Sequence, residues 1–323
     1  MVENENRKEM EARQALEPHL APGEQLLAYA SGNVVGATSQ PYYLGLTAER
    51  LLMLPLKRGK PSGEPLSLLR EVIKSLTGSG WLQYRLQIKA PQDTLTVVCA
   101  GRWVKRAKDL VSRFAAAPPL PITGPATAAQ RSLRQARDFM NLGLLASAQQ
   151  QFKDAMTAAP SLATDSVAAE LQAQLAETRL ALRVGAGFCF GNIGVAVVIF
   201  ALLALLSQTQ SLAEVFNFSL IFSLLIDLYV GLNLWQGKAQ WRGWALARAI
   251  LGLLFYGFLA LSQSDWIGLV TQIAFSGSFI ILLTGKSTRI RTWLAVGLYV
   301  FGYLGITFGL LLFSFIRGLL RAL

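Results

Sequence analysis

The stretch GWALARAILGLLFYGFLALSQSDWIGLVTQIAFSGSFIILLTG, residues 243–285, decides the fold of the C-terminal half of the chain. It contains two apolar runs, 243–263 and 266–285, separated only by a short polar break. Each run has about the 20 residues that a helix needs to cross the apolar core of a bilayer. The stretch therefore predicts two transmembrane helices joined by a tight turn.

Further apolar runs of similar length flank this stretch. The expected spans cover residues 184–207, 213–236, 243–263, 266–285 and 293–316. The chain of 323 residues is 53% hydrophobic, and the excess lies in this half, where acidic residues are rare. We therefore expect residues 184–323 to form an all-α transmembrane bundle of about five helices.

Positive charges in the connections predict the orientation of these spans, because Lys and Arg gather in cytoplasmic loops. The loops SQTQSLAE and SQSD carry none, whereas the other connections carry Arg179, Arg183, Lys238, Arg242, Lys286, Arg289 and Arg291. We expect a multi-pass protein of the cytoplasmic (inner) membrane with its N-terminal half in the cytoplasm and, after five spans, its C-terminus outside. Arg317 and Arg321 oppose that last assignment. The charged start, residues 1–20, lacks the apolar run of a secretory signal.

The N-terminal half begins with a polar helix over residues 1–19, in which Pro18 is expected to end the helix. Residues 20–117 then change period. Short runs rich in Leu, Val and Tyr alternate with Gly, Pro, Asp and Asn, which is typical of antiparallel strands. The runs are EQLLAYAS, YYLGLT, RLLMLPL, LQYRLQIKA and TLTVVCA, and an amphipathic helix is expected from Trp103 onward.

This order of a strand-rich unit and one closing helix resembles bacterial PH-like domains, the group that includes GRAM and related folds. The resemblance rests on PGEQLLAYASG, on YYLGLTAERLLML, where a strand ends at Thr47 and the next begins at Arg50, and on the final helix. It implies a small antiparallel β domain whose surface binds a partner.

Residues 118–127 form a Pro-rich linker. Beyond it, residues 128–183 show two helical periods and then a single helix from Asp165 to Arg183. The order and spacing of one set of residues resemble a tetratricopeptide repeat: Ala136, Phe139, Gly143, Leu145, Ala148, Phe152, Ala155 and Pro160. The resemblance implies a helical hairpin plus a covering helix, and a multidomain α+β chain. One repeat is too short for the concave groove of repeat arrays, so peptide binding would need an oligomer or a partner.

Asp227 is the residue of the membrane half that calls for a functional reading. A carboxylate in mid-membrane costs about 2.5–3.5 kcal/mol, so we expect it to face the bundle interior or to be protonated. One reading places it on an ion, proton or substrate path near Asn233 and opposite Arg248. The favoured reading makes Asp227 and Arg248 a structural pair, with Asn192, Asn233 and Gln272 as hydrogen-bonding residues between helices.

Two basic clusters of the β domain are candidate contacts for anionic lipid. Lys57, Arg58 and Lys60 share one turn, and Lys105, Arg106 and Lys108 share one helix. Each could contribute on the order of 1 kcal/mol near an anionic membrane surface. The alternative is that they are solvated charges without a specific role.

Catalytic and metal-binding patterns are missing from the sequence. His19 is the single histidine, the two cysteines lie far apart at Cys99 and Cys189, and no phosphate-binding loop or nucleophile elbow occurs. We expect no cofactor and no enzymatic activity. The net charge of +11 lacks the long basic blocks with interleaved aromatic residues that favour nucleic acid, so we expect no nucleic-acid partner.

The sequence therefore favours a membrane-anchored, non-enzymatic scaffold or adaptor. We expect it to contact membrane lipids and either a protein partner or further copies of itself. The alternative is a transporter or channel subunit, or a lipid-handling membrane protein, with Asp227 in its pathway. A membrane enzyme that uses Asp227 is the least favoured reading.

Overall fold

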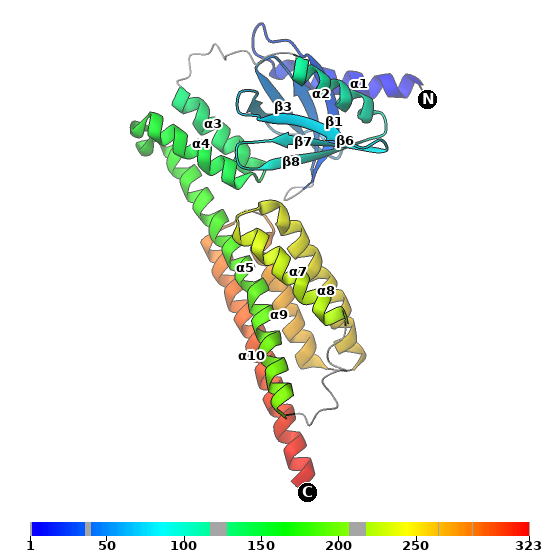
Figure 1. The fold of residues 1–323 in the computed structure, drawn as a ribbon, viewed down its shortest axis with the longest axis vertical. Coiled ribbons are helices and arrows are strands. Elements are labelled where there is room, and N and C mark those ends of the chain that lie inside the picture. The colour runs from blue at the N-terminus through cyan, green and yellow to red at the C-terminus, as the bar shows by residue number, and fades with distance from the viewer. Residues whose placement is uncertain are drawn as a thin grey trace. The chain divides into compact units, whose positions relative to one another are not determined.

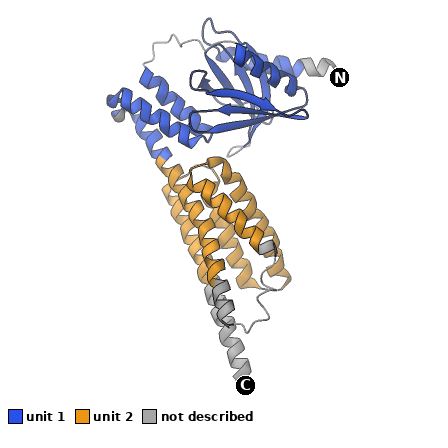
Figure 2. Cartoon of the chain, in the orientation of Figure 1, with its two compact units in different colours: residues 1–175 blue, residues 176–323 orange. Residues whose placement is uncertain are grey.

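A computed structural model describes residues 2–35, 40–116, 128–206, 218–263, 265–285 and 287–322. Side chains are described for these residues except 2–6, 163, 199–206, 218–220 and 306–322. The chain divides into two compact units, Met1–Leu175 (unit 1) and Ala176–Leu323 (unit 2), which are drawn in different colours in Figure 2. The Pro-rich linker at 118–127 and the loop SQTQSLAE at 207–214 lie outside the described residues.

Unit 1 contains one antiparallel sheet (Figure 1). Its strands are β1 (Ala28–Val35), β2 (Pro41–Leu46), β3 (Arg50–Lys57), β4 (Lys60–Pro61), β5 (Leu66–Leu69), β6 (Ser75–Ser79), β7 (Gln83–Lys89) and β8 (Thr94–Ala100). Their order is β4-β3-β2-β1-β8-β7-β6, and β5 pairs with β3 beyond the end of β4. This confirms the predicted antiparallel β domain.

The five predicted strand runs correspond to β1, β2, β3, β7 and β8. In β7, buried and exposed residues alternate along the strand, as a half-buried strand requires. β4, β5 and β6 were not predicted. The sequence of β6, SLTGS, has little of the β-branched and aromatic content that marks a strand, and it is held in place by pairing with β7.

Helices at both ends of this segment pack on the sheet. The predicted polar helix is α1 (Val2–Leu16), followed by the short 3₁₀ helix η1 (Glu17–His19), in which Pro18 is the second residue. Leu16 is fully buried in a cluster with Tyr43 and Leu52 of the sheet. The predicted closing helix is α2 (Trp103–Ala116), which contacts β1, β6, β7 and β8. Its buried residues, Ala107 and Leu110, lie on one face of the helix, as the amphipathic pattern predicted.

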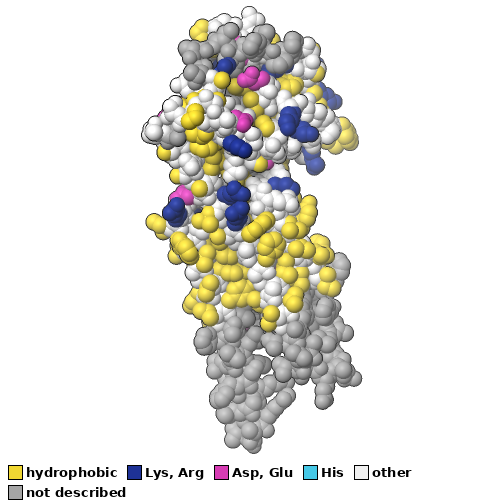
Figure 3. Space-filling model, turned by 60° about the vertical axis from the view of Figure 1, so that its left-hand side comes forward, with side chains coloured by type: hydrophobic (Ala, Val, Ile, Leu, Met, Phe, Trp, Pro, Cys, Tyr) yellow, Lys and Arg dark blue, Asp and Glu magenta, His cyan; other side chains and the backbone are white. Residues whose placement is uncertain are grey.

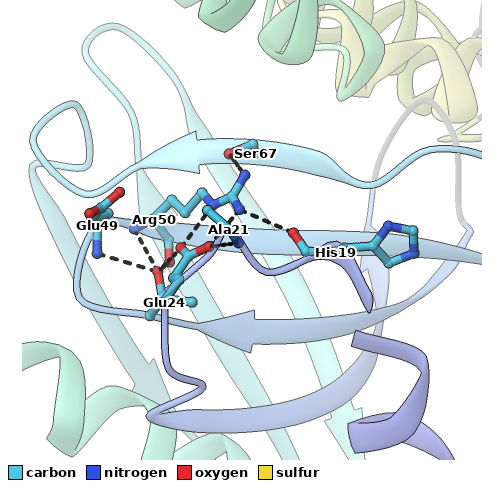
Figure 4. Close-up of polar contacts among 7 residues, drawn as sticks. His19, Ala21, Glu24, Glu49, Arg50 and Ser67 are labelled. Carbon is cyan, nitrogen blue, oxygen red and sulfur yellow. Dashed lines mark hydrogen bonds and ion pairs between the residues drawn. The ribbon is translucent and has the colours of Figure 1, made fainter. Parts of the chain in front are cut away.

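An ion pair joins the two sequence stretches on which the PH-like resemblance rests (Figure 4). Arg50 donates from Nε and Nη2 to the two oxygens of Glu24, at 2.9 and 2.6 Å, and Thr47 Oγ1 donates to Glu24 at 2.7 Å. Arg50 also donates to the backbone oxygen of His19 at 3.1 Å. Burial favours the neutral acid, but the hydrogen bonds from Arg50, the Ala21 N–H and Thr47 outweigh it, so the pKa of Glu24 lies below its ordinary value. The cluster fixes the entry to β1 against the β2–β3 turn.

The predicted repeat signature lies on a hairpin of two helices, α3 (Ala128–Asn141) and α4 (Leu145–Ala158). Phe139 and Ala148 are fully buried between them. Gly143 forms the turn with a positive φ of 76°, which glycine adopts without strain. Pro160 begins a 3₁₀ helix, η2 (Pro160–Thr164), after the end of α4. The helical hairpin is present, and membership of the tetratricopeptide family remains a prediction.

This hairpin is hydrogen-bonded to the sheet at β5. Within the described residues, β5 pairs with only one strand, so its outer edge would leave backbone groups without partners. Gln135 of α3 accepts from the Leu69 N–H at 3.1 Å and donates to the Ser67 carbonyl, and Asp138 accepts from the Ser67 N–H at 3.2 Å. The side chains of one helix thus complete the edge of the strand.

A second joint lies at the start of α4. The Ser147 hydroxyl accepts from the Gln92 and Asp93 N–H groups, each at 3.1 Å, and the Ser147 N–H donates to the Asp93 carboxylate at 2.7 Å. Ser147 is fully buried. With contacts at both β5 and the β7–β8 turn, the hairpin and the sheet form one body within unit 1.

Unit 2 is helical. It comprises the C-terminal part of α5 (Ser166–Leu206), then α7 (Phe218–Trp235), the 3₁₀ helix η3 (Ala239–Trp241), α8 (Arg242–Ser262), α9 (Trp266–Leu283) and α10 (Arg289–Ala322). Three helical segments of the described residues are long and apolar enough to cross a membrane: Ser166–Val198, which begins in unit 1, and Ala239–Ser262 and Trp266–Leu283 of unit 2. On the face shown in Figure 3, hydrophobic side chains form a broad band over the helices of this unit. The protein is therefore a membrane protein.

Three of the five predicted spans are described only in part. In the span at 184–207, side chains are described only to Val198. The span at 213–236 includes the shorter apolar helix Ile221–Trp235, and the span at 293–316 falls on α10, whose side chains are described only to Gly305. The number of spans and their orientation remain predictions. The helix expected at Asp165–Arg183 and the span expected at 184–207 form one continuous helix, α5. This stretch contains no Pro, and the helix continues through the glycines that follow the expected boundary, the first of which are Gly185 and Gly187.

Candidate functional site

The candidate site lies in unit 2, where α7 and α8 are joined by a short connection. Asp227 lies about two turns before the end of α7 and Arg248 about two turns after the start of α8. Residues at equal distances from the turn between two antiparallel helices lie at the same depth. The sequence spacing alone therefore brings this carboxylate and this guanidinium together.

The two side chains form a bidentate ion pair. Arg248 donates from Nε and Nη2 to the two carboxylate oxygens of Asp227, and Nη2 also donates to Ser223 Oγ at 2.8 Å. The side chain of Asp227 is only 1% exposed, whereas that of Arg248 is 29% exposed. Paired forks of this kind neutralise both charges and fix their geometry. Asp227 and Arg248 are thus in contact, and their role as an internal structural pair remains a prediction.

Asn192 of α5 connects the pair to a second polar group. Its Nδ2 lies 3.5 Å from an Asp227 oxygen, and its Oδ1 lies 2.9 Å from the Tyr299 hydroxyl and 3.1 Å from the Tyr303 hydroxyl. Tyr299 also lies 2.6 Å from the carbonyl oxygen of Phe188. A polar network thus extends across α5, α7, α8 and α10.

Gln272, expected to hydrogen-bond between helices, instead donates to Ser276 of its own helix, α9, at 3.2 Å. The last sequence candidate of the membrane half, Asn233, is not part of the network around Asp227. It donates to the Tyr229 carbonyl at 2.7 Å and accepts from Lys238 at 3.0 Å, near the end of α7. Sequence reasoning also missed Ser223, Tyr299 and Tyr303. The spacing of the two tyrosines, four residues apart in an apolar helix, was the available signal, because such residues share one face.

A cavity of about 190 Å³ adjoins the ion pair. Its polar lining residues are Asn192, Asp227, Arg248, Tyr256, Gln272 and Ser276, and Phe275 and Phe279 contribute apolar surface. At about 30 Å³ per water molecule, this volume is large enough for several waters or one small polar solute. Because Asp227 and Arg248 neutralise each other, the lining offers hydrogen bonds without a net charge.

Most residues of the two basic clusters of unit 1 are exposed, and one of them forms an ion pair within the domain. Lys57, Arg58 and Lys60 are exposed at the tip of the β3–β4 hairpin, whose two turn residues, Arg58 and Gly59, both have positive φ. Lys105 and Lys108 are also exposed. Arg106 instead pairs with Glu9 of α1, and its guanidinium carbon lies 4.8 Å from the centre of the Tyr29 ring. Five of the six predicted lipid-contact residues are therefore accessible, and their role remains a prediction.

Neither cysteine has the surroundings of a reactive thiol. Cys99 and Cys189 are free and buried, and burial raises the pKa of Cys99 to about 11. Within the described residues, no group of three or more His, Cys, Asp or Glu side chains could hold a metal ion.

Comparison with known proteins adds no relative. No protein-family model matches the sequence, and no curated protein matches it.

Proposed function

We propose that this protein is a membrane-anchored, non-enzymatic scaffold, in which unit 2 holds the chain in the cytoplasmic membrane and unit 1 offers binding surfaces to a protein or lipid partner. The observation that carries the proposal is the joining of the helical hairpin to the sheet. Gln135, Asp138 and Ser147 hydrogen-bond to the edges of the sheet and make two potential binding modules one body. A fixed pair of modules recognises a composite surface without the entropy cost of ordering them on binding.

The resemblances support the same proposal. A PH-like β domain and a tetratricopeptide-like hairpin are both modules that bind partners, and the sheet with its closing helix and the paired helices provide the elements that each would need. This part of the support is analogy from fold to function. The positive charges between the expected spans favour a cytoplasmic position for both modules.

The polar network of unit 2 supports an anchoring role for the membrane helices. Asp227 and Arg248 neutralise each other, and Asn192 links them to Tyr299 of α10. Side chains that hydrogen-bond across helices hold a bundle together, typically by about 0.6 kcal/mol and up to about 2 kcal/mol for each bond. We therefore assign the network to helix association.

The cavity beside Asp227 favours a second candidate function. A transporter, channel subunit or lipid-handling protein would use this volume of about 190 Å³ to hold a small polar solute or headgroup next to the ion pair. In that case the soluble unit would regulate the membrane helices.

In-cell crosslinking followed by purification in mild detergent tests the scaffold proposal. We expect specific proteins to co-purify with the full chain. They should no longer co-purify with the Gln135→Leu variant, which lacks the acceptor of the Leu69 N–H. They should still co-purify with the control variant Gln172→Ala, on the exposed side of α5. All variants should stay in the membrane fraction. A chain that purifies alone, together with solute flux in liposomes that Asp227→Asn abolishes, would establish the second candidate instead.

A further inference from the structure

The turn between β6 and β7 exposes two large apolar side chains that the sheet does not use. Trp81 is 82% exposed and Leu82 is 66% exposed, and both lie at the tip of the hairpin. Most of the large apolar side chains of the β domain point into the core, as the alternation of β7 shows. Two adjacent exposed apolar residues on a tip are a feature of binding loops, because exposed apolar surface is otherwise selected against.

The backbone presents this tip rigidly. Gly80 has a φ of 107°, and a Cβ atom there would lie 2.2 Å from the carbonyl oxygen of Gln83. Below it, the Tyr84 ring covers Gly78 so closely that a Cβ atom on Gly78 would lie 2.3 Å from the ring. The turn therefore has a defined shape that does not depend on Trp81 or Leu82.

Exposed cations lie beside the tip. Arg85 is exposed on β7 directly opposite Ser79, where the strand pairing begins, and Lys108 of α2 lies 5.9 Å from the centre of the Tyr84 ring. Neither cation is in an ion pair within the described residues, whereas Arg106 on the same helix is neutralised by Glu9. An apolar tip with neighbouring cations is complementary to an anionic lipid surface.

We propose that the β6–β7 tip is a membrane-interface anchor, in which Trp81 and Leu82 enter the boundary between headgroups and acyl chains of an anionic bilayer and Arg85 and Lys108 contact the headgroups. The indole side chain suits this depth because its N–H can stay hydrogen-bonded at the headgroups while the apolar part of the ring is removed from water. The bilayer is the occupant because the same chain carries membrane-spanning helices, which hold unit 1 at a high effective concentration near the lipid surface. The proposal is independent of whether the protein is a scaffold.

A spin label at the tip tests this in the full chain. Because both native cysteines are buried, Leu82→Cys provides one accessible thiol for a nitroxide. The labelled protein is reconstituted in vesicles of zwitterionic phospholipid with and without one quarter anionic phospholipid, and its collision rates with oxygen and with a water-soluble nickel complex are measured. A label at Lys60→Cys, at the start of β4, reports on the other exposed basic cluster, Lys57, Arg58 and Lys60.

We expect the label at position 82 in anionic vesicles to collide with oxygen several-fold more, and with nickel several-fold less, than the label at position 60. The difference should disappear when Trp81→Ser is added, a change that leaves folding intact because Trp81 is exposed. Three results would overturn the proposal: equal accessibility at both positions, a tip shielded from both nickel and oxygen as in a protein contact, or insertion that survives Trp81→Ser.

Discussion

Asp138 makes the joint between the hairpin and the sheet sensitive to pH. Its carboxylate accepts from the Ser67 N–H, and the residue is half-buried on the side of α3 that contacts β5. Burial raises the pKa of Asp138 from 3.8 to about 6, although the Ser67 hydrogen bond and the nearby Arg137 and Arg134 oppose the rise. The folded joint therefore binds a proton more tightly than the open one.

The difference in the pKa of Asp138 between the folded and the open joint makes the free energy of opening depend on pH. Between pH 4 and 6 the folded state holds more protons than the open state, so the free energy of opening falls as pH rises through this window and is constant above it. A gap of about two pH units, at about 1.4 kcal/mol per unit, corresponds to about 3 kcal/mol. Asp138→Asn keeps an acceptor for the Ser67 N–H but removes the charge. We expect it to stabilise the joint at pH 7 by up to about 3 kcal/mol and to abolish the pH dependence.

Hydrogen exchange of the full chain in detergent measures the free energy of opening of this joint. The amides of Ser67 and Leu69 report on opening of the joint, after correction for the intrinsic pH dependence of exchange. The matched control is Asp154→Asn on the exposed side of α4. A wild-type protein whose protection is constant from pH 4 to 6.5, or an Asp138→Asn variant that opens more readily at pH 7, would refute the reasoning.

Three further predictions concern other contacts. Glu24→Gln should destabilise unit 1 by about 3 kcal/mol at pH 7, because it leaves the Arg50 guanidinium without a compensating negative charge. Since the pKa of Glu24 is lowered, this loss of stability should shrink as pH falls below about 4, which denaturant titrations at two pH values would show. Asp227→Leu should lower the stability of the bundle by about 3–5 kcal/mol, and adding Arg248→Leu should recover most of the lost stability. Thermal unfolding in lipid nanodiscs tests this. A double variant no more stable than the single variant would contradict a structural pair. Gly78→Ala should cost about 2 kcal/mol in denaturation because its Cβ would meet the Tyr84 ring, and adding Tyr84→Ala should relieve the strain.

Much of the fold could be predicted because its signals are local. The Leu-rich runs of β2 and β3 and the apolar runs of α8 and α9 reveal their elements within about ten or twenty residues. β5 and β6 could not be predicted from LSLL and SLTGS, since their pairing partners, rather than their own residues, make them strands.

In the candidate site too, contacts near one turn could be predicted from the sequence, whereas contacts between distant helices could not. Asp227 and Arg248 could be paired from the sequence because they are equally far from one turn. Asn233 was grouped with them by its place in the same apolar helix, but it lies close enough to the end of α7 to reach Lys238. Tyr299 comes from a distant helix, and only the packing of α10 against the bundle brings it to Asn192. The bonds of Gln135 to β5 also depend on tertiary contact.

The side chains that complete β5 are synthesised well after the strand itself. Asp138 follows Leu69 by 69 residues, which takes roughly 3–14 s at about 5–20 residues per second. During that interval the strand leaves the ribosome with an uncovered edge that can pair with a neighbouring chain. Any fragment that ends in the Pro-rich linker, the domain boundary that the composition suggests, also lacks the side chains that complete the edge of β5. An expression fragment meant to remain monomeric should therefore extend past α4, and one ending near residue 117 should self-associate.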